Sequence, residues 1–416
     1  MKINMIGLGY IGLPTAALMS TKGAMSVVGV DISQYVCDTV NRGDIHIVEE
    51  RLESLVKRAV ESKSLTASTK PTEADAYVIA VPTPFKEDKT PDLKYVEQAC
   101  KDIAPFLTKG SLVILESTSP VGATEQVVSW LQNIREDLTF PSDSSDSTPD
   151  VYVAYCPERV LPGNVIEELQ KNDRVIGGMS SACSEKAKNF YERFVDGECI
   201  VTNSKTAEMA KLTENSFRDV NIAFANELSM ICGDLGIDVW ELIALTNRHP
   251  RVNVLQPGCG VGGHCIAVDP WFIVNSAPEK AKIIKQARLT NDHKPLWVAA
   301  EVLKVYSELL SDSQVNVTCY GLSFKPNIDD FRESPAVSVV KEIARIMPNA
   351  KIQVVEPFIG HEKPKELDGI DNVSIIDYDK KLVSDIKVML VAHDVFKSDY
   401  EDIKQSGEVI NFAWRS

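Results

Sequence analysis

Two cysteines of this 416-residue chain, Cys259 and Cys265, lie in a loop that is dense in glycine. Residues 257–265 read PGCGVGGHC, and Asp269 follows Cys265 by four positions. Glycine lets a backbone approach a bulky ligand, and a thiol in such a loop can attack a carbonyl if a neighbouring group activates it. An isolated cysteine is more often a small buried apolar residue. Cys265 is therefore a candidate nucleophile only if other segments supply activating groups.

A long helical pattern supplies candidates for that activation. Lys211, Asn215 and Arg218 occupy positions i, i+4 and i+7, so their side chains gather on one helix face and can point at one ligand. A solvated polar stripe has the same spacing. A further cluster of basic and acidic residues, at 324–332, follows an expected strand; it can bind phosphate or tie loops together through ion pairs.

The N-terminus carries a nucleotide-binding pattern. Gly7, Gly9 and Gly12 form a GxGxxG motif between an expected strand and an expected helix. These glycines permit a tight turn, close approach to a pyrophosphate and close helix–strand packing, with the phosphate on the N–H groups of the helix start. Asp31 ends the next apolar strand, where its carboxylate accepts from ribose hydroxyls and repels a 2′-phosphate. The pattern predicts NAD as the cofactor, with FAD as the main competitor.

The elements that must position these residues alternate between strand and helix at both ends of the chain. Expected strands are 2–6, 26–30, 76–81, 111–116, 151–155, 174–178, 315–320, 351–355, 387–392 and 408–411. Expected helices begin near residues 12, 35, 52 and 93 and cover 206–235, 279–310 and 335–347. Such alternation is typical of doubly wound parallel sheets. We predict an α/β protein with two Rossmann-like domains, 1–203 and 309–416, joined by a mainly helical module, 204–308.

Composition excludes several classes of function. The net charge of −15 disfavours general binding to nucleic acids or to an anionic membrane surface. No apolar run approaches the ~18 residues of a membrane span. The nine cysteines are scattered without a Cys-x-x-Cys pair, and the six histidines lack zinc-like spacing. We expect a cytoplasmic, reduced protein without a structural metal, with an exposed loop at 140–150.

Taken together, the motifs resemble those of the UDP-sugar 6-dehydrogenase family over essentially the whole chain. The matching segments, in order, are GLGYIGLP, STSPVG, YCPERVLPG, Lys211-x-x-x-Asn215, GVGGHCIAVDPWF and GLSFKPNIDDFRESP. The GGHC and PERVLPG segments look like the branch that acts on UDP-N-acetylhexosamines. The stretch NRHPRVNVLQPG looks most like members that oxidise UDP-N-acetyl-D-mannosamine.

The resemblance implies a four-electron oxidation of the sugar C6 alcohol with NAD as acceptor. Cys265 matches the nucleophile that traps the C6 aldehyde as a thiohemiacetal, which a second oxidation converts into a thioester for hydrolysis to the uronate. Lys211 would serve as acid/base or as electrostatic stabiliser of the C6 oxygen. Asn215 would hold that oxygen or its water. Asp269 matches the acidic partner, and Glu158 is a second candidate for activating water.

The same resemblance implies the binding residues and the assembly. The NAD contacts beyond the glycines would be Tyr10, Ile11, Asp31, Thr83, Thr118 and Arg332. The UDP-sugar site would be lined by Arg159, Val160, Lys211, Asn215, Arg218, His249, Arg251, Gly262, Phe324 and Lys325. Because the loop of His249 and Arg251 reaches across a subunit interface in the family, a homodimer built on the central module is implied.

Three departures from the family pattern affect particular residues. Leu161-Pro162 replaces a second acidic residue of UDP-glucose relatives, which weakens a two-glutamate arrangement for activating water. The spacing from Arg251 to Cys265 is shorter than in those relatives, so Arg251 is matched through the hexosamine branch alone. Cys259 stands where the branch usually has proline, and an inhibitory Cys259–Cys265 disulfide is a hypothesis.

Several alternative functions share parts of this pattern. Within the class, the substrate could instead be UDP-N-acetylglucosamine or UDP-glucose. A two-electron hydroxyacid-type dehydrogenase shares the N-terminal domain and a helical lysine but needs neither Cys265 nor a third domain. A non-catalytic NAD sensor would have no use for a nucleophile. The sequence leaves the epimer preference at C2 open.

Overall fold

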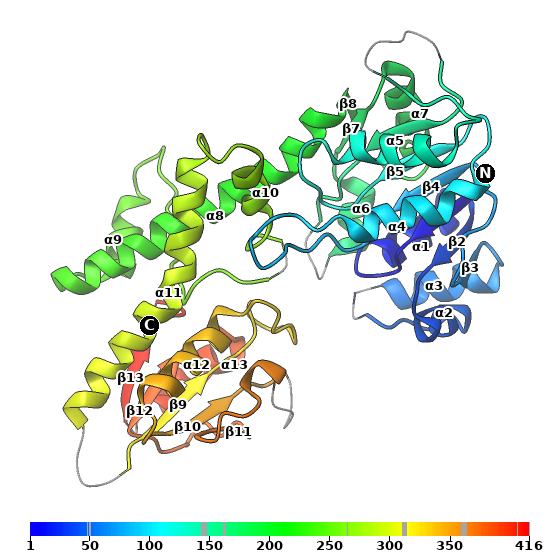
Figure 1. Ribbon diagram of the computed structural model, residues 1–416. Helices are drawn as coiled ribbons and strands as arrows, with labels where there is room; N and C mark the ends of the chain where they lie inside the picture. Colours follow the sequence, from blue (N-terminus) through cyan, green and yellow to red (C-terminus); the bar gives the residue numbers. More distant parts are fainter. Residues whose placement is uncertain are drawn as a thin grey trace. The chain divides into compact units, whose positions relative to one another are not determined.

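A computed structural model describes residues 1–47, 49, 51–142, 148–160, 164–263, 265–309, 314–358, 364–405 and 407–415. The chain divides into two compact units (Figure 1). The first comprises residues 1–214 with 271–276, and the second comprises 215–270 with 277–416. Part of the expected loop at 140–150 lies outside the described residues, as do Leu161, Pro162 and His264.

The first unit contains an eight-stranded sheet in the order β3-β2-β1-β4-β5-β6-β7-β8. Neighbouring strands are parallel except at the β6–β7 pair, which is antiparallel. The strands are β1 (Lys2–Ile6), β2 (Ser26–Val30), β3 (Leu65–Ser68), β4 (Ala76–Ile79), β5 (Leu112–Leu115), β6 (Tyr152–Tyr155), β7 (Arg174–Gly178) and β8 (Cys199–Asn203).

Helices cover both faces of this sheet. They are α1 (Gly12–Thr21), α2 (Gln34–Asn41), α3 (Leu52–Glu61), α4 (Lys94–Ile103), α5 (Ala123–Ile134), α6 (Val165–Lys171) and α7 (Ser181–Tyr191), with a short turn, η1 (Ala104–Phe106). Met5 and Val78 pack with α1, α3 and α7 on one face. Tyr77 and Ile79 pack with α4 and α5 on the other. Because both faces are buried, the central strands are continuously apolar.

Long helices dominate the middle of the chain. They are α8 (Ser204–Leu235), α9 (Val239–Thr246), α10 (Asp269–Ser276) and α11 (Lys282–Leu309), the last with Pro295 inside it. Buried polar groups join α8 to α11 within the second unit. Arg288 donates to Asp219 at 2.5 Å, and Asn291 donates to the same Asp219 oxygen at 2.8 Å. Such buried groups are tolerated only when paired, so they set the register of the two helices.

The second unit also contains a five-stranded parallel sheet in the order β11-β10-β9-β12-β13. Its strands are β9 (Asn316–Tyr320), β10 (Lys351–Val355), β11 (Val373–Ile376), β12 (Ile386–Met389) and β13 (Glu408–Asn411). Its helices are α12 (Pro335–Ile346), α13 (Asp394–Ser398) and α14 (Tyr400–Ile403), with the turn η2 (Lys365–Leu367). The predicted fold class is therefore confirmed: two doubly wound sheets with a helical region between them in sequence.

The two sheets repeat the same strand order, and the repeat extends to individual hydrogen bonds. Gly7 and Gly321 follow the first strand of each sheet with φ of +96° and +95°. Their N–H groups donate to Val30 and Val355 at 2.7 and 2.8 Å, the last residues of the neighbouring strands. The five strands of the second sheet therefore have the same topology as β3-β2-β1-β4-β5 of the first.

Candidate active site

The glycine motif forms a strand–turn–helix unit at the carboxyl edge of the first sheet. Gly12 begins α1 so close to the preceding turn that a Cβ there would lie 1.8 Å from the Gly7 carbonyl oxygen. A Cβ at Gly9 would meet nothing within 4 Å, which leaves open space beside the turn. No side chain caps the start of α1 in the described chain. This open space and the uncapped helix N–H groups fit a dinucleotide pyrophosphate.

Asp31 lies immediately after β2, as the motif requires. Its two carboxylate oxygens accept from the Leu8 N–H at 3.1 Å and the Ser33 N–H at 2.9 Å. The carboxylate is therefore fixed beside the glycine turn while remaining partly exposed. A carboxylate oxygen accepts more than one hydrogen bond, so Asp31 keeps capacity for ribose hydroxyls. Tyr10 is exposed and Ile11 half-buried in the same turn.

The next two strand ends bring Thr83 and Thr118 together. Thr83 Oγ1 donates to the Thr118 carbonyl oxygen at 2.5 Å. The loop after β5 is further held by Glu208 on α8, a residue that the sequence analysis missed. The fully buried Glu208 carboxylate accepts from Gly122 N–H at 2.7 Å and from Thr124 N–H at 2.8 Å. One turn of α8 separates Glu208 from Lys211, so this pair of bonds fixes the helix that carries Lys211.

Glu158 is buried near the end of β6, with 7 % of its surface exposed. Burial raises the pKa of Glu158 to about 7, against the opposing positive charges of Lys211 and Arg174. Its Oε1 atom is buried with no hydrogen-bond partner within the described chain. A carboxyl that changes protonation near neutral pH and keeps an open acceptor is suited to taking a proton from water.

Arg159 is already engaged within the first unit. Its guanidinium contacts Glu214 at 2.7 Å and donates to the Asp173 carbonyl oxygen at 3.2 Å. Glu214 lies on α8 between Lys211 and Asn215, so this ion pair ties the segment of Glu158 to the helix of Lys211. Val160 is half-buried beside it. To bind a phosphate, Arg159 would exchange or share its contact with Glu214.

Asn215 and Asp269 meet although 54 residues separate them. Asn215 Nδ2 donates to Asp269 Oδ2 at 2.5 Å, and Asp269 is 3 % exposed. The Asp269 N–H also donates to the Cys265 carbonyl oxygen at 2.9 Å, which closes a turn at the start of α10. Cys265 itself is exposed. The second unit therefore holds an accessible thiol one turn from the buried Asp269, which is paired with the half-buried Asn215.

The glycine loop before Cys265 is closely packed at Gly260 and Gly262 within the second unit. A Cβ at Gly260 would lie 2.7 Å from Pro335, and one at Gly262 would lie 2.9 Å from Phe324 Cβ and 2.4 Å from the Glu333 carbonyl oxygen. The Gly258 N–H donates to Asn226 Oδ1 at 2.9 Å, and Asn226 donates to Asn291. The glycines are needed because three elements converge on this loop.

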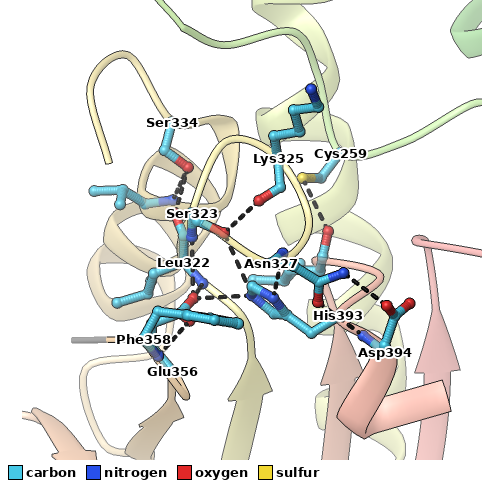
Figure 2. Close-up of polar contacts among 12 residues, drawn as sticks. Cys259, Leu322, Ser323, Lys325, Asn327, Ser334, Glu356, Phe358, His393 and Asp394 are labelled. Carbon is cyan, nitrogen blue, oxygen red and sulfur yellow. Dashed lines mark hydrogen bonds and ion pairs between the residues drawn. The ribbon is translucent and has the colours of Figure 1, made fainter. Parts of the chain in front are cut away.

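Phe324 and Lys325 lie on the loop between β9 and α12, against the cysteine loop. A Cβ at Gly263 would lie 2.8 Å from the Phe324 ring. Lys325 is exposed and points away from the buried residues beneath it (Figure 2). Arg332, predicted as a cofactor contact, belongs to this second unit and pairs with Asp330 through two guanidinium nitrogens at 2.9 and 2.6 Å. Of the two roles expected for the 324–332 cluster, Arg332 and Asp330 therefore form an ion pair within the loop.

His249 and Arg251 lie exposed in the turn that follows α9. The Arg251 N–H donates to His249 Nδ1 at 3.4 Å. Arg218 is also exposed, on the α8 face one turn beyond Asn215. Both His249 and Arg251 are thus exposed to solvent in a single chain.

The two cysteines of the loop differ sharply in environment. Cys259 is 5 % exposed, its thiol donates to the Leu390 carbonyl oxygen at 3.5 Å, and burial raises its pKa to about 12. Cys265 is exposed, and neither residue forms a disulfide. A Cys259–Cys265 disulfide would require Cys259 to leave its buried position, so the structure gives this hypothesis no support.

The described residues contain neither a cluster of metal ligands nor a membrane-spanning helix. Among them no three His, Cys, Asp or Glu side chains gather as metal ligands. Of the helices that they form, none has the length and apolarity to cross a membrane.

Comparison with known proteins covers the whole chain. Residues 1–195, 205–293 and 318–411 match the NAD binding, central and UDP binding domains of the UDP-glucose/GDP-mannose dehydrogenase family. The UDP-N-acetyl-D-mannosamine dehydrogenase of Salmonella typhi is 59% identical over 99% of both chains. The NDP-N-acetyl-D-galactosaminuronic acid dehydrogenase of Ralstonia solanacearum is 53% identical over 98% of this chain and 95% of its own.

The solved structures agree with the sequence relatives. The UDP-D-ManNAc dehydrogenase of Pyrococcus horikoshii superposes with a TM-score of 0.87 at 35% identity, covering 99% of this chain and 95% of its own. A TM-score of 0.87 over this coverage shows that the two chains share one fold.

Proposed function

Because the chain belongs to the UDP-glucose/GDP-mannose dehydrogenase family, we propose that it oxidises UDP-N-acetyl-D-mannosamine at C6 to UDP-N-acetyl-D-mannosaminuronate. It is an NAD-dependent oxidoreductase. The observation that carries the reaction class is an exposed thiol, Cys265, one turn from Asp269, whose buried carboxylate accepts from Asn215. Identity of 59% to a mannosamine dehydrogenase over 99% of both chains supports the substrate.

The residues divide between holding the cofactor and performing the chemistry. Bound NAD would supply a hydride acceptor, held by the turn of Gly7, Gly9 and Gly12 and by Asp31. A first hydride transfer to NAD would give the C6 aldehyde, and Cys265 would add to it to form a thiohemiacetal. A second hydride transfer to NAD would give the thioester, which water would hydrolyse to the uronate and free thiol. Asn215, fixed by Asp269, would orient the C6 oxygen or the attacking water. Lys211 would stabilise negative charge on that oxygen.

In this proposal Glu158 accepts a proton from the water that hydrolyses the thioester. The rate of uronate release should therefore depend on pH. Since its pKa is about 7, the ionised form that accepts a proton is populated mainly above that pH. Uronate release should therefore rise as the pH increases through 7. Glu158→Gln should abolish this dependence and slow hydrolysis by about 100-fold or more, so that thioester accumulates after a rapid burst of NADH.

Stopped-flow measurement of the burst across pH 6 to about 8.5 checks this expectation. Glu158→Asp, which keeps a carboxyl, is the control and should retain a pH-dependent release step. An unchanged rate of steady-state turnover in Glu158→Gln would remove Glu158 from the mechanism.

The substrate assignment is tested by counting NADH per sugar consumed. UDP-N-acetyl-D-mannosamine should yield two NADH per molecule, because the conversion of an alcohol to a carboxylate removes four electrons. UDP-N-acetylglucosamine and UDP-glucose should yield little. UDP-N-acetylgalactosamine belongs in the same assay because of the Ralstonia solanacearum relative. One NADH per sugar would refute the thioester route, and preference for another sugar would reassign the substrate.

The homodimer remains part of the proposal, and an apolar stripe on α8 supports it. Phe217, Phe224 and Ile231 recur every seven residues and are 71, 54 and 46% exposed. Side chains at this spacing lie on one helix face, and soluble monomers rarely leave such a stripe uncovered. A second copy of the chain would cover it and would bring the loop of its own His249 and Arg251 to a substrate site.

The stripe predicts that Phe224→Glu converts the dimer into a monomer, because it places a charge in the centre of an apolar contact. Sedimentation velocity of the wild-type and variant chains checks the result. Val383→Glu is the control, since Val383 is 75% exposed and lies outside the central helices. A wild-type chain that sediments as a monomer at micromolar concentration would contradict the proposal.

A further inference from the structure

A buried carboxylate–histidine pair lies beneath the loop that carries Phe324 and Lys325. Glu356 directly follows β10 and is 4% exposed, while His393 precedes α13 and is fully buried. His393 Nε2 lies 3.2 Å from Glu356 Oε2 (Figure 2). None of the motifs in the sequence analysis includes either residue. Two buried ionisable groups in contact are costly unless each hydrogen bond is used, so the partners of this pair are informative.

The carboxylate of Glu356 accepts hydrogen bonds from backbone N–H groups at the start of the loop that carries Phe324 and Lys325. Its Oε2 atom accepts from the Leu322 N–H at 2.6 Å and from the Ser323 N–H at 3.1 Å. Its Oε1 atom accepts from the Phe358 N–H at 3.2 Å. Three backbone amides and one imidazole therefore converge on a single carboxylate, which fixes the backbone at 322–323.

The imidazole of His393 holds the other end of the loop. The Asn327 N–H donates to His393 Nδ1 at 2.9 Å, so Nδ1 is an acceptor and the ring proton lies on Nε2, facing Glu356. Asn327 has a φ of +62°, in the left-handed region of the backbone, which residues other than glycine adopt at a cost in free energy. Asp394 also holds Asn327, because its carboxylate accepts a hydrogen bond from Asn327 Nδ2 at 2.8 Å.

The first sheet has a carboxylate at the position equivalent to Glu356. Glu356 corresponds to Asp31: both follow the second strand, accept from the residue after the equivalent glycine, and accept from the N–H two positions ahead. Asp31 keeps capacity for a ligand, whereas Glu356 gives its remaining capacity to Ser323 and His393. The carboxylate that binds ribose in a dinucleotide fold therefore holds protein backbone in the second unit.

We propose that Glu356 and His393 are positioning residues that hold residues 322–327 in the conformation that binds the UDP portion of the substrate. The proposal rests on the proposed function and on the UDP-sugar contacts that the family resemblance implies for Phe324 and Lys325. The pair touches no substrate; it acts through the loop. Phe324 packs against Gly263, and Cys259 donates to Leu390 on the segment that leads to His393, so the same support reaches the cysteine loop.

The test is UDP affinity, measured by titration calorimetry, together with KM for the UDP-sugar in His393 variants. His393→Ala leaves the Asn327 N–H without its acceptor and should raise both the UDP dissociation constant and KM by about ten-fold. The NAD dissociation constant should stay unchanged. His393→Asn can return an acceptor towards Asn327 and should recover most of the UDP affinity. His393→Gln can return a donor towards Glu356 and should recover thermal stability more than UDP affinity.

Thr318→Val is the matched control, because it removes a buried hydrogen bond of 2.9 Å to Ser384 in the same sheet without touching the loop. It should lower the melting temperature and leave UDP affinity unchanged. UDP affinity within two-fold of wild type in a folded His393→Ala or His393→Gln chain would overturn the proposal. If the wild type binds UDP but fails to oxidise the mannosamine sugar, the substrate assignment fails while the UDP titrations still test the pair.

Discussion

Replacing Cys265 by serine should reduce uronate formation by at least about 1,000-fold, because a serine hydroxyl is a far weaker nucleophile than a thiolate at neutral pH. Any remaining oxidation should stop at the aldehyde, so residual NADH should not exceed one per sugar. Product analysis by mass spectrometry, alongside NADH absorbance, separates the aldehyde from the uronate.

Cys259→Ser is the matched control for this experiment, since it alters the other thiol of the same loop. A serine hydroxyl can keep the bond to the Leu390 carbonyl oxygen, so this variant should still release two NADH per sugar. Full uronate formation by Cys265→Ser would refute the covalent mechanism. If mild oxidation inactivates the wild type but spares Cys259→Ser, the disulfide hypothesis would regain support.

The second large effect is expected at the glycine turn of the first sheet. A Cβ at residue 12 would lie 1.8 Å from the Gly7 carbonyl oxygen, a separation that the backbone must relieve by moving. Gly12→Ala should therefore cost at least about 3 kcal/mol and lower the melting temperature by about 10 °C. Differential scanning calorimetry and NAD titration should both detect the loss.

Gly9→Ala separates folding from cofactor binding at the same turn. A Cβ at Gly9 would meet nothing within 4 Å, so the melting temperature without NAD should be unchanged. The same methyl group would occupy the space that a pyrophosphate needs, and the NAD dissociation constant should rise by about ten-fold or more. Equal NAD affinity in Gly9→Ala and wild type would mean that the cofactor lies elsewhere.

The sequence by itself determined the elements whose signals are local or continuous. The turn from Gly7 to Gly12 joins β1 to α1 as predicted, because its constraints act within a few residues. The strands 2–6, 26–30, 174–178, 351–355 and 408–411 have the predicted bounds. Most lie within a sheet covered on both faces, where long apolar runs are required. The helical spacing of Lys211 and Asn215 likewise needs only the period of α8.

Three of the four edge strands of the two described sheets were not recognised, whereas the fourth, β13 (Glu408–Asn411), was predicted with its bounds. β3, β8 and β11 each lie at the end of a sheet, and each has only its first residue buried. A strand that contacts the core at one or two positions has neither a continuous apolar run nor a clear alternation. Pairing with a neighbour that is distant in sequence makes these segments strands.

Tertiary structure alone decided the environment of the chemical groups. Asn215 meets Asp269 across 54 residues, and His393 meets Glu356 across 37. Glu158 acquires a pKa of about 7 because the fold buries it, a property that no pattern of neighbours in the chain contains. Residue types and spacings identify candidate groups, but desolvation and long-range hydrogen bonds exist only after the strand ends have been brought together.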